Sequence, residues 1–171
     1  MVELKPLNRA ADADVENLLD HAFGADRFAR TAYRVRAGLN PLAKLSFSAW
    51  DGDTLVGALQ SWAVALAGDD GSRHPLVMVG PVAVSPVAQR GGMGKQMMAH
   101  MLAIAGDAAD GALMLVGDAP YYSRFFGFDT AATADWRLPG PFDPARLLAR
   151  PIGGHLPPAL PGMIVGDPQR R

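Results

Sequence analysis

An apolar run extends from Leu76 to Val84 and is suited to a central strand that is buried on both faces of a sheet. Pro81 lies inside this run and has no backbone N–H to donate to a neighbouring strand. Within sheets, proline is expected only at an edge, at a bulge or where two strands part. We therefore expect pairing to fail near Pro81, so that two central strands splay apart after it and leave backbone groups free for a ligand.

Two amphipathic helices are expected before this strand. The first runs from an N-cap at Asp12 to Gly24, with apolar residues at the spacing of one helical face. The second is predicted between a cap at Asp26 and a stop at Gly38. Its inner residues are expected to be Phe28, Ala32 and Val35, and its arginines, Arg27, Arg30 and Arg34, are predicted to form a solvated face.

The other predicted elements complete a mixed α/β fold, in which helices cover both faces of a twisted sheet that is antiparallel at first. They are a hairpin over Leu45–Leu66 that turns at Asp51-Gly52-Asp53, a helix over Met93–Ala108, a strand over Ala112–Gly117, a short helix over Tyr121–Phe126 and a strand over Phe128–Trp136. Seven of the 14 prolines lie between Pro139 and Pro161. Residues 138–171 are therefore expected to be a proline-rich extension, with a strand around Met163–Val165, packed on a single domain of residues 1–171.

Composition excludes several classes of function. The formal net charge is -1 over 171 residues, so no global basic field attracts nucleic acid or a membrane surface. There is no cysteine, and the four histidines are scattered without the spacing of a helical metal pair, so we expect no disulfide and no metal. The sequence shows neither the apolar core of a secretory signal nor a membrane-spanning segment, which makes the cytoplasm the expected location.

The segment Val84–Lys95 joins the apolar strand to a helix through a loop that contains three glycines. Glycine lets the backbone approach a ligand closely, and the first turn of a helix offers unpaired N–H groups and the positive end of its dipole. The loop is therefore predicted to bind a phosphate or pyrophosphate, although an ordinary strand-to-helix turn stays as the alternative. A P-loop is disfavoured because Gln96 replaces the magnesium-binding hydroxyl, and Met97 breaks the dinucleotide-binding fingerprint.

A Gln-x-x-Gly-x-Gly pattern follows a Val-x-Pro turn in this loop, formed by Val84, Pro86, Gln89, Gly92 and Gly94. With this pattern the chain resembles the GNAT family of N-acetyltransferases, in particular its small bacterial YhbS-like branch, over the order of elements from residue 1 to about residue 137. The resemblance implies a GNAT-like fold that admits coenzyme A between the splayed strands. It further implies that the strand backbone binds the pantetheine arm through Val82, Ala83 and Val84. The loop is implied to bind the pyrophosphate, mainly through main-chain N–H groups, and its cofactor-binding residues are Gln89, Arg90, Gly91, Gly92, Met93, Gly94 and Lys95.

The segment from Tyr121 to Phe128 resembles the Tyr…Gly-Phe segment of the same family, whose tyrosine lies near the thioester sulfur. A phenol with a pKa of about 10 can donate a proton to the departing thiolate. The family's tyrosine usually stands four residues before the glycine, whereas Tyr122 stands five before Gly127, and Tyr121 stands six before it. Tyr122 is the preferred catalytic residue, Tyr121 the alternative, and Asp118 is expected to cap the short helix.

The resemblance implies an N-acetyltransferase that passes the acetyl group of acetyl-CoA directly to an amine of a small molecule or protein, without an acyl-enzyme. A non-catalytic acyl-CoA sensor or scaffold of the same fold is the alternative, and the irregular tyrosine spacing favours it. The acceptor cannot be read from the sequence, but its walls are expected to come from the early helices and the proline-rich extension. The apolar residues of that extension make it a candidate surface for a homodimer.

Overall fold

The predicted central strand is the fourth of eight strands in one mixed sheet, in a computed structural model that describes residues 1–171. The main strand order is β1-β2-β3-β4-β5-β7, and β8 adds to β3 and β6. The strands are β1 Val2–Pro6, β2 Phe47–Asp51, β3 Thr54–Gly68, β4 Arg73–Val84, β5 Ala112–Val116, β6 Trp136–Arg137, β7 Leu147–Arg150 and β8 Gly162–Gly166. The predicted mixed α/β fold is confirmed.

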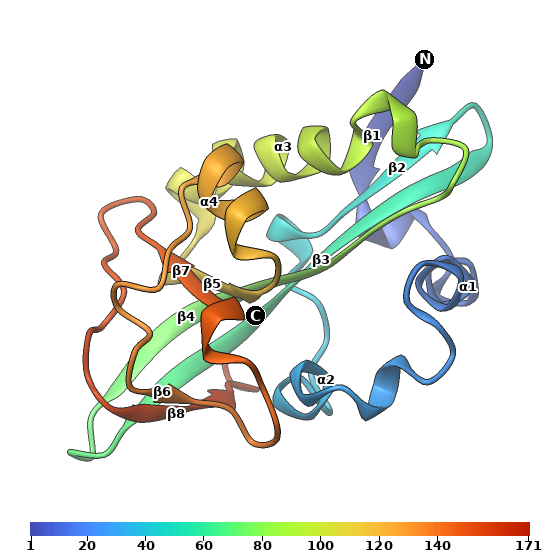
Figure 1. Cartoon of the computed structure of the whole chain (residues 1–171). Coiled ribbons are helices and arrows are strands. Elements are labelled where there is room, and N and C mark those ends of the chain that lie inside the picture. The colour runs from blue at the N-terminus through green and yellow to red at the C-terminus, as the bar shows by residue number, and fades with distance from the viewer.

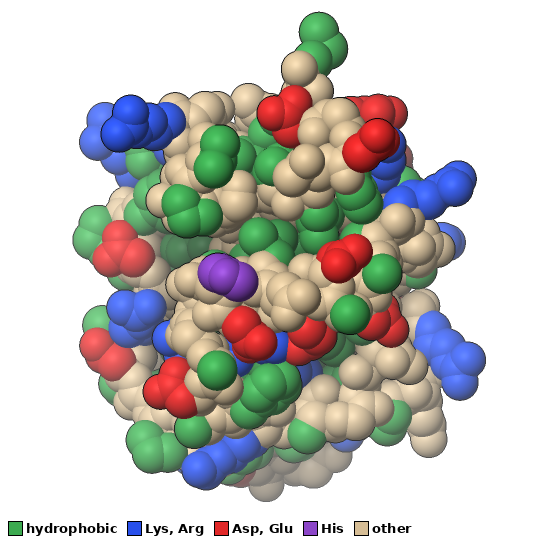
Figure 2. Space-filling model, turned by 90° about the vertical axis from the view of Figure 1, so that its right-hand side faces the viewer, with side chains coloured by type: hydrophobic (Ala, Val, Ile, Leu, Met, Phe, Trp, Pro, Cys, Tyr) green, Lys and Arg blue, Asp and Glu red, His purple; other side chains and the backbone are tan.

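Helices cover both faces of this sheet, as Figure 1 shows: α3 and α4 lie on one side, α1 and α2 on the other. The α-helices are α1 Asp12–Phe23, α2 Thr31–Val35, α3 Met93–Ala108 and α4 Ala119–Phe126; short 3-10 turns are η1 Leu7–Arg9, η2 Arg27–Ala29, η3 Ala43–Leu45, η4 Gln89–Gly91 and η5 Pro144–Arg146. None of these helices combines the length and the apolar character that a membrane crossing needs. On the face shown in Figure 2, basic and acidic side chains are interspersed.

The alternation of side chains along the strands explains why buried clusters lie on both faces of the sheet. On one face, Met97 and Met101 of α3 pack in a buried cluster with Leu59 and Val77 of the sheet. On the other face, α1 places Leu19 in a cluster with sheet alanines, among them Ala58. Burying each such methionine or leucine completely contributes about 1.5–3 kcal/mol, so both helices are fixed by their apolar faces.

The central strands part as the sequence predicted, although slightly earlier. β4 pairs in parallel with β5 only from Leu76 to Met78, and β5 does not pair with β4 past Met114. On its other edge β4 stays antiparallel to β3, but the register shifts where one residue, Gln60, lies opposite Gly80 and Pro81. Pairing between β4 and β5 therefore ends at Met78, three residues before Pro81, and this edge of β4 has no partner strand beyond that point.

The second predicted helix is wrong in its middle. The chain forms the 3-10 turn η2, then an extended residue at Arg30, and only then the five-residue α2. Arg27, predicted to be solvated, is 1% exposed, whereas Phe28, predicted to face inward, is 60% exposed. The reason is charge pairing: Arg27 donates to the Asp20 carboxylate of α1 at 2.9 Å and also pairs with Glu16.

Residues after α4 differ in part from the prediction. The strand expected over Phe128–Trp136 is mostly turns, and only the two-residue β6 forms at its end. The strand predicted around Met163–Val165 is confirmed as β8, which pairs antiparallel with β3. The sequence analysis did not predict β1 or β7, and β7 pairs antiparallel with β5. Two strands of the proline-rich segment, β7 and β8, are thus part of the sheet rather than only packed on it.

Candidate functional site

A cavity of about 600 Å³ lies where the two central strands part. β4 contributes the residues from Met78 to Val82 to its lining, and the end of β5 contributes Leu115, Val116 and the following Gly117. Its other walls are the segment from the end of α1 through α2 and the segment around η5. The expected role of these segments as walls of an acceptor site stays a prediction. The wall residues from these two segments are Phe23, Ala29, Arg30, Thr31, Ala32, Tyr33, Arg34 and Arg36, and Leu138, Pro141, Phe142, Asp143 and Arg146.

The Gly80 carbonyl is held from the β3 side at the mouth of the gap. It accepts hydrogen bonds from the Trp62 indole N–H at 2.7 Å and from an Arg36 Nη1–H at 3.0 Å. Gly80 has φ 119°, a conformation that residues with a Cβ rarely adopt. These contacts fix the β4 backbone at the point where its pairing with β5 has already ended.

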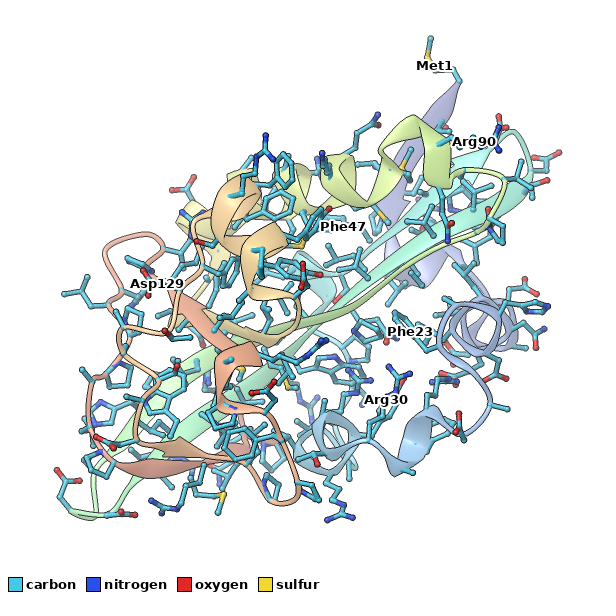
Figure 3. The ribbon with its side chains drawn as sticks, viewed as in Figure 1. Met1, Phe23, Arg30, Phe47, Arg90 and Asp129 are labelled. Atoms are coloured by element: carbon cyan, nitrogen blue, oxygen red, sulfur yellow. The ribbon has the colours of Figure 1, made fainter.

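The glycine-rich loop forms the start of α3, at the opposite side of the sheet from Arg30, as the labelled Arg90 and Arg30 in Figure 3 show. Gly92 is the N-cap with φ 69°, in the left-handed region, and no side chain caps the helix. Gln96 donates the helix's first hydrogen bond, to the Gly92 carbonyl. The N–H groups that precede it in the first turn therefore have no intrahelical acceptor.

The surroundings of this loop are open. A Cβ added at Gly91 or Gly92 would meet no heavy atom within 4 Å. Gln89 turns its side chain back and donates to the Val84 carbonyl at 3.3 Å, which ties the loop to the end of β4. Arg90 and Lys95 are exposed and form no ion pair, and the Lys95 ammonium lies 3.6 Å from the centre of the Phe125 ring. The loop thus exposes amides and positive charge rather than filling itself with its own side chains.

The two tyrosines of α4 occupy different places. Tyr122 lines the cavity, whereas Tyr121 does not; the two rings meet edge to face with centroids 5.0 Å apart. Burial raises the pKa of the Tyr122 phenol above its ordinary value, which keeps it protonated at neutral pH. Asp118 caps α4, as predicted, because its carboxylate accepts from the Tyr121 N–H at 3.2 Å.

The predicted site residues on β4 divide between the two faces of the sheet. Val82 lines the cavity, and the Ala83 side chain is buried in the cluster under α1. Val84 lies against the cluster that α3 covers. Their backbones pair with β3 on one edge, through Leu59, Ala58 and Gly57, and β5 does not reach their other edge. No three His, Asp or Glu side chains gather as metal ligands would.

Four arginines line the cavity without having been predicted from the sequence as site residues: Arg30, Arg34, Arg36 and Arg146. Arg30 and Arg34 were assigned to a solvated face, and although both are exposed they also line the cavity. Phe23 and Arg30 lie beside each other below the sheet (Figure 3), with an Arg30 Nη2–H donating to the Phe23 carbonyl at 3.1 Å. No local pattern in the sequence identifies these residues as neighbours, because residues 30–36 and residue 146 come to the same cavity only when the chain folds.

Comparison with known proteins agrees with this arrangement. A family model described as an acetyltransferase (GNAT) domain matches residues 3–131, whereas no curated protein matches the sequence. The structure of the GNAT family N-acetyltransferase YhbS from Escherichia coli, in complex with CoA, has a TM-score of 0.69 at 21% identity, over 98% of this chain and 89% of that chain. A GNAT family acetyltransferase from Brucella melitensis, in complex with acetyl-CoA, has a TM-score of 0.65 at 19% identity, over 98% and 96%.

These findings confirm the resemblance on which the sequence analysis relied, and they support acyl transfer at the level of the family. The match of the family model covers most of the chain, from β1 to the turns after α4. The likeness to the two solved structures extends over nearly all of it and shows the same fold. The chain belongs to the GNAT acetyltransferase family.

Proposed function

We propose that this chain is an N-acetyltransferase that uses acetyl-CoA as co-substrate and transfers the acetyl group directly to a primary amine. Family membership supports acyl transfer, and the two similar structures were solved with CoA and acetyl-CoA. The observation that carries the proposal is the gap between β4 and β5, with a cavity and the Tyr122 phenol at its edge.

We assign the coenzyme to the unpaired edge of β4 and the loop that follows it. The pantetheine arm would bond to the backbone of Val82, Ala83 and Val84, since β5 leaves that edge open. The pyrophosphate would bind the amides between Arg90 and Lys95, where the positive end of the α3 dipole and two exposed cations favour negative charge. Gln89 contributes by holding the loop to the Val84 carbonyl.

Tyr122 is assigned the role of general acid, which donates one proton to the leaving thiolate. The lone pair of the neutral amine attacks the thioester carbonyl carbon, a C–N bond forms, and the C–S bond then breaks to release the CoA thiolate. Tyr122 donates its phenolic proton to that sulfur, and the proton that the amine nitrogen loses restores the phenol through solvent. The raised pKa of Tyr122 favours this role, because the group must enter the reaction protonated.

Two measurements test the proposal. Acetyl-CoA is expected to raise the melting temperature of the protein, whereas ATP with magnesium is not, because a ligand that binds only the folded state stabilises it. Thiol release from acetyl-CoA over a panel of amines then separates an enzyme from a non-catalytic sensor. Stabilisation by acetyl-CoA without thiol release from any amine would favour the sensor, and stabilisation by ATP alone would refute both functions.

Replacing the two tyrosines separately tests the assignment of the acid. Tyr122→Phe is expected to lower kcat about 100-fold, because a positioned general acid contributes at least that much. Tyr121→Phe, the matched control outside the cavity, is expected to change kcat less than threefold. The assignment is wrong if Tyr121→Phe abolishes thiol release while Tyr122→Phe leaves it unchanged.

A further inference from the structure

The charge on the cavity wall differs from that of the whole chain. Four arginines line it, Arg30, Arg34, Arg36 and Arg146, against one carboxylate, Asp143, although the formal net charge of the protein is -1. Ion pairs elsewhere neutralise Arg27, Arg73, Arg137 and Arg170. None of the four cavity arginines forms an ion pair, so the wall keeps an excess of three positive charges for a ligand.

Arg36 is the most informative of these residues because it is only 6% exposed. Its guanidinium stacks 3.7 Å from the centre of the Tyr33 ring and donates one hydrogen bond, to the Gly80 carbonyl. A guanidinium has five N–H donors, and buried charges are as a rule paired with an opposite charge. Glu16, in the adjoining hollow that Arg36 also lines, is already bound to Arg27. Arg36 is therefore a buried cation without a counterion at the cavity wall.

Neutral contacts hold the neighbouring arginines in place without cancelling their charge. Arg30 donates to the Phe23 carbonyl and Arg34 to the Pro139 carbonyl, at 3.1 and 3.2 Å. Arg146 lines the same cavity as Tyr122, and its charge partly offsets the rise that burial causes in the pKa of the Tyr122 phenol. Asp143 uses one carboxylate oxygen to accept the Ala145 N–H at 3.0 Å, and its charge stays exposed at the cavity.

We propose that the acceptor is a small amine that also carries an anionic group, either a carboxylate or a phosphate. Arg36 binds this anionic group together with Arg30 and Arg34. This inference rests on the proposed function. A planar guanidinium matches either group through two parallel hydrogen bonds. The cavity volume of about 600 Å³ suits a small molecule, and its apolar residues, among them Leu138 and Phe142, suit the carbon skeleton. The amine would then lie toward the gap, near Tyr122.

Matched pairs of acceptors that differ only in the anionic group test this proposal. We would compare β-alanine with propylamine, phenylalanine with phenethylamine, and phosphoethanolamine with ethanolamine, measuring kcat/KM by thiol release and the melting shift of the acetyl-CoA-loaded protein. At least one anionic member is expected to exceed its neutral partner about 30-fold or more in kcat/KM, and to raise the melting temperature. Carboxylate and phosphate pairs show which of the two groups the site takes.

Arginine variants locate the effect. Arg36→Gln is expected to remove most of the preference for the anionic acceptor, and Arg30→Gln and Arg34→Gln, at exposed positions that tolerate substitution, to reduce it several-fold. Arg30→Gln and Arg34→Gln should not alter the KM for acetyl-CoA more than about threefold. Arg36 also holds the Gly80 carbonyl of β4, so its variant is compared for acceptor preference alone. Arg9→Gln, an exposed arginine that does not line this cavity, is the control and should leave the preference unchanged.

Three results would overturn the inference. Neutral amines that react as well as their anionic partners would leave the N-acetyltransferase proposal intact and refute the anionic acceptor. Variants that raise the KM for acetyl-CoA while keeping acceptor preference would assign the arginines to the coenzyme instead. If no amine, anionic or neutral, gives thiol release or a melting shift while acetyl-CoA still stabilises the protein, both the acceptor class and turnover fail, and the sensor alternative stands.

Discussion

Gly117 determines where the phenol of Tyr122 lies. It stands directly after β5, and a Cβ built on it would come within 2.6 Å of the Tyr122 ring and 3.1 Å of Leu115. Real Cβ atoms do not approach other atoms at 2.6 Å, so the Tyr122 ring occupies space that is free only because residue 117 has no Cβ. The position of the proposed acid is therefore set by a residue that takes no part in the chemistry.

Gly117→Ala is expected to push the Tyr122 ring out of place and lower kcat about 10- to 100-fold, because small misplacements of a catalytic group are costly. Gly106→Ala is the matched control: it lies inside α3, has no atom within 4 Å of its Cβ, and should add about 0.5–1 kcal/mol of stability. Thiol release and urea unfolding measure the two effects. Unchanged kcat in Gly117→Ala would contradict the positioning role.

The raised pKa of Tyr122 has a consequence for pH dependence. The folded-state value lies above the unfolded value of about 10, so between the two the folded protein binds more protons than the unfolded chain. The stability that the protonated phenol contributes is thus fully present below about pH 10, and it is lost as the pH rises from there through the higher pKa of the folded state. A difference titration of tyrosinate absorbance, wild type minus Tyr122→Phe, is expected to show a midpoint above about pH 10. A midpoint at or below that value would contradict the burial of this phenol.

At the scale of single elements, the loop before α3 depends on backbone conformation more than on side-chain charge. Gly92 adopts φ 69°, whereas Gly91 has no positive φ, and at both positions an added methyl group would stand in open space. A left-handed residue with a Cβ costs roughly 1–2 kcal/mol. The direction of the first α3 amides therefore relies on Gly92.

Gly92→Ala is expected to weaken acetyl-CoA binding about 10-fold, because the loop would relax away from its left-handed N-cap. Gly91→Ala, the control in the same loop, should change the Kd less than threefold. Arg90→Ala should also weaken binding less than Gly92→Ala does, since main-chain groups are proposed to dominate. Calorimetric titration with acetyl-CoA measures all three, and a larger loss in Arg90→Ala than in Gly92→Ala would refute this ranking.

At the scale of the whole molecule, Arg170 closes the end of the sheet opposite the gap. Its guanidinium donates to the Val64 carbonyl of β3 at 2.6 Å and to the Leu76 carbonyl of β4 at 3.2 Å. It also binds the carboxylates of Asp110, just before β5, and Asp167. Leu76 is where the pairing of β4 with β5 begins. This one side chain therefore connects β3, β4 and the residue that lies just before β5, at the closed end of the gap.

Arg170→Ala is expected to lower the free energy of unfolding by about 3 kcal/mol, because it removes several charged hydrogen bonds at once. Arg171→Ala, an exposed neighbour without an ion pair, should change it by no more than about 0.5 kcal/mol. Urea unfolding at neutral pH measures both, and equal effects of the two variants would contradict the clamp.

The contact between Arg170 and Asp110 also predicts how the stability of the protein changes at low pH. Hydrogen bonds from Arg170 hold the pKa of Asp110 below its ordinary value. The stability that this carboxylate contributes is therefore fully present above its unfolded pKa of about 3.9, and it is lost as pH falls through the lower folded value. The stability difference between wild type and Asp110→Asn is accordingly expected to shrink below about pH 4. A difference that stays constant down to about pH 2 would refute this linkage.

Local patterns were sufficient for the elements that carry their own signal. The apolar run with Pro81 predicted both the central strand and the loss of pairing, because proline lacks a donor wherever it stands. The hairpin at Asp51–Asp53, the α3 helix and the glycine-rich loop follow equally from residues adjacent in sequence. The motif in that loop also indicated the family, because its glycines mark where the backbone must come close to a ligand or adopt a positive φ.

Contacts between distant residues decided the rest. Arg27 is buried because Glu16 and Asp20 of another helix pair with it, and β7 forms because β5 offers an open edge to Leu147–Arg150. Tertiary packing also decided that Tyr122, and not Tyr121, lines the cavity. The cavity's arginines came together only on folding, since residues 30–36 and 146 share no local period. Sequence alone thus determined where backbone is left unpaired, whereas tertiary structure decided which charges line the space beside it, because charge pairing depends on neighbours that only the folded chain provides.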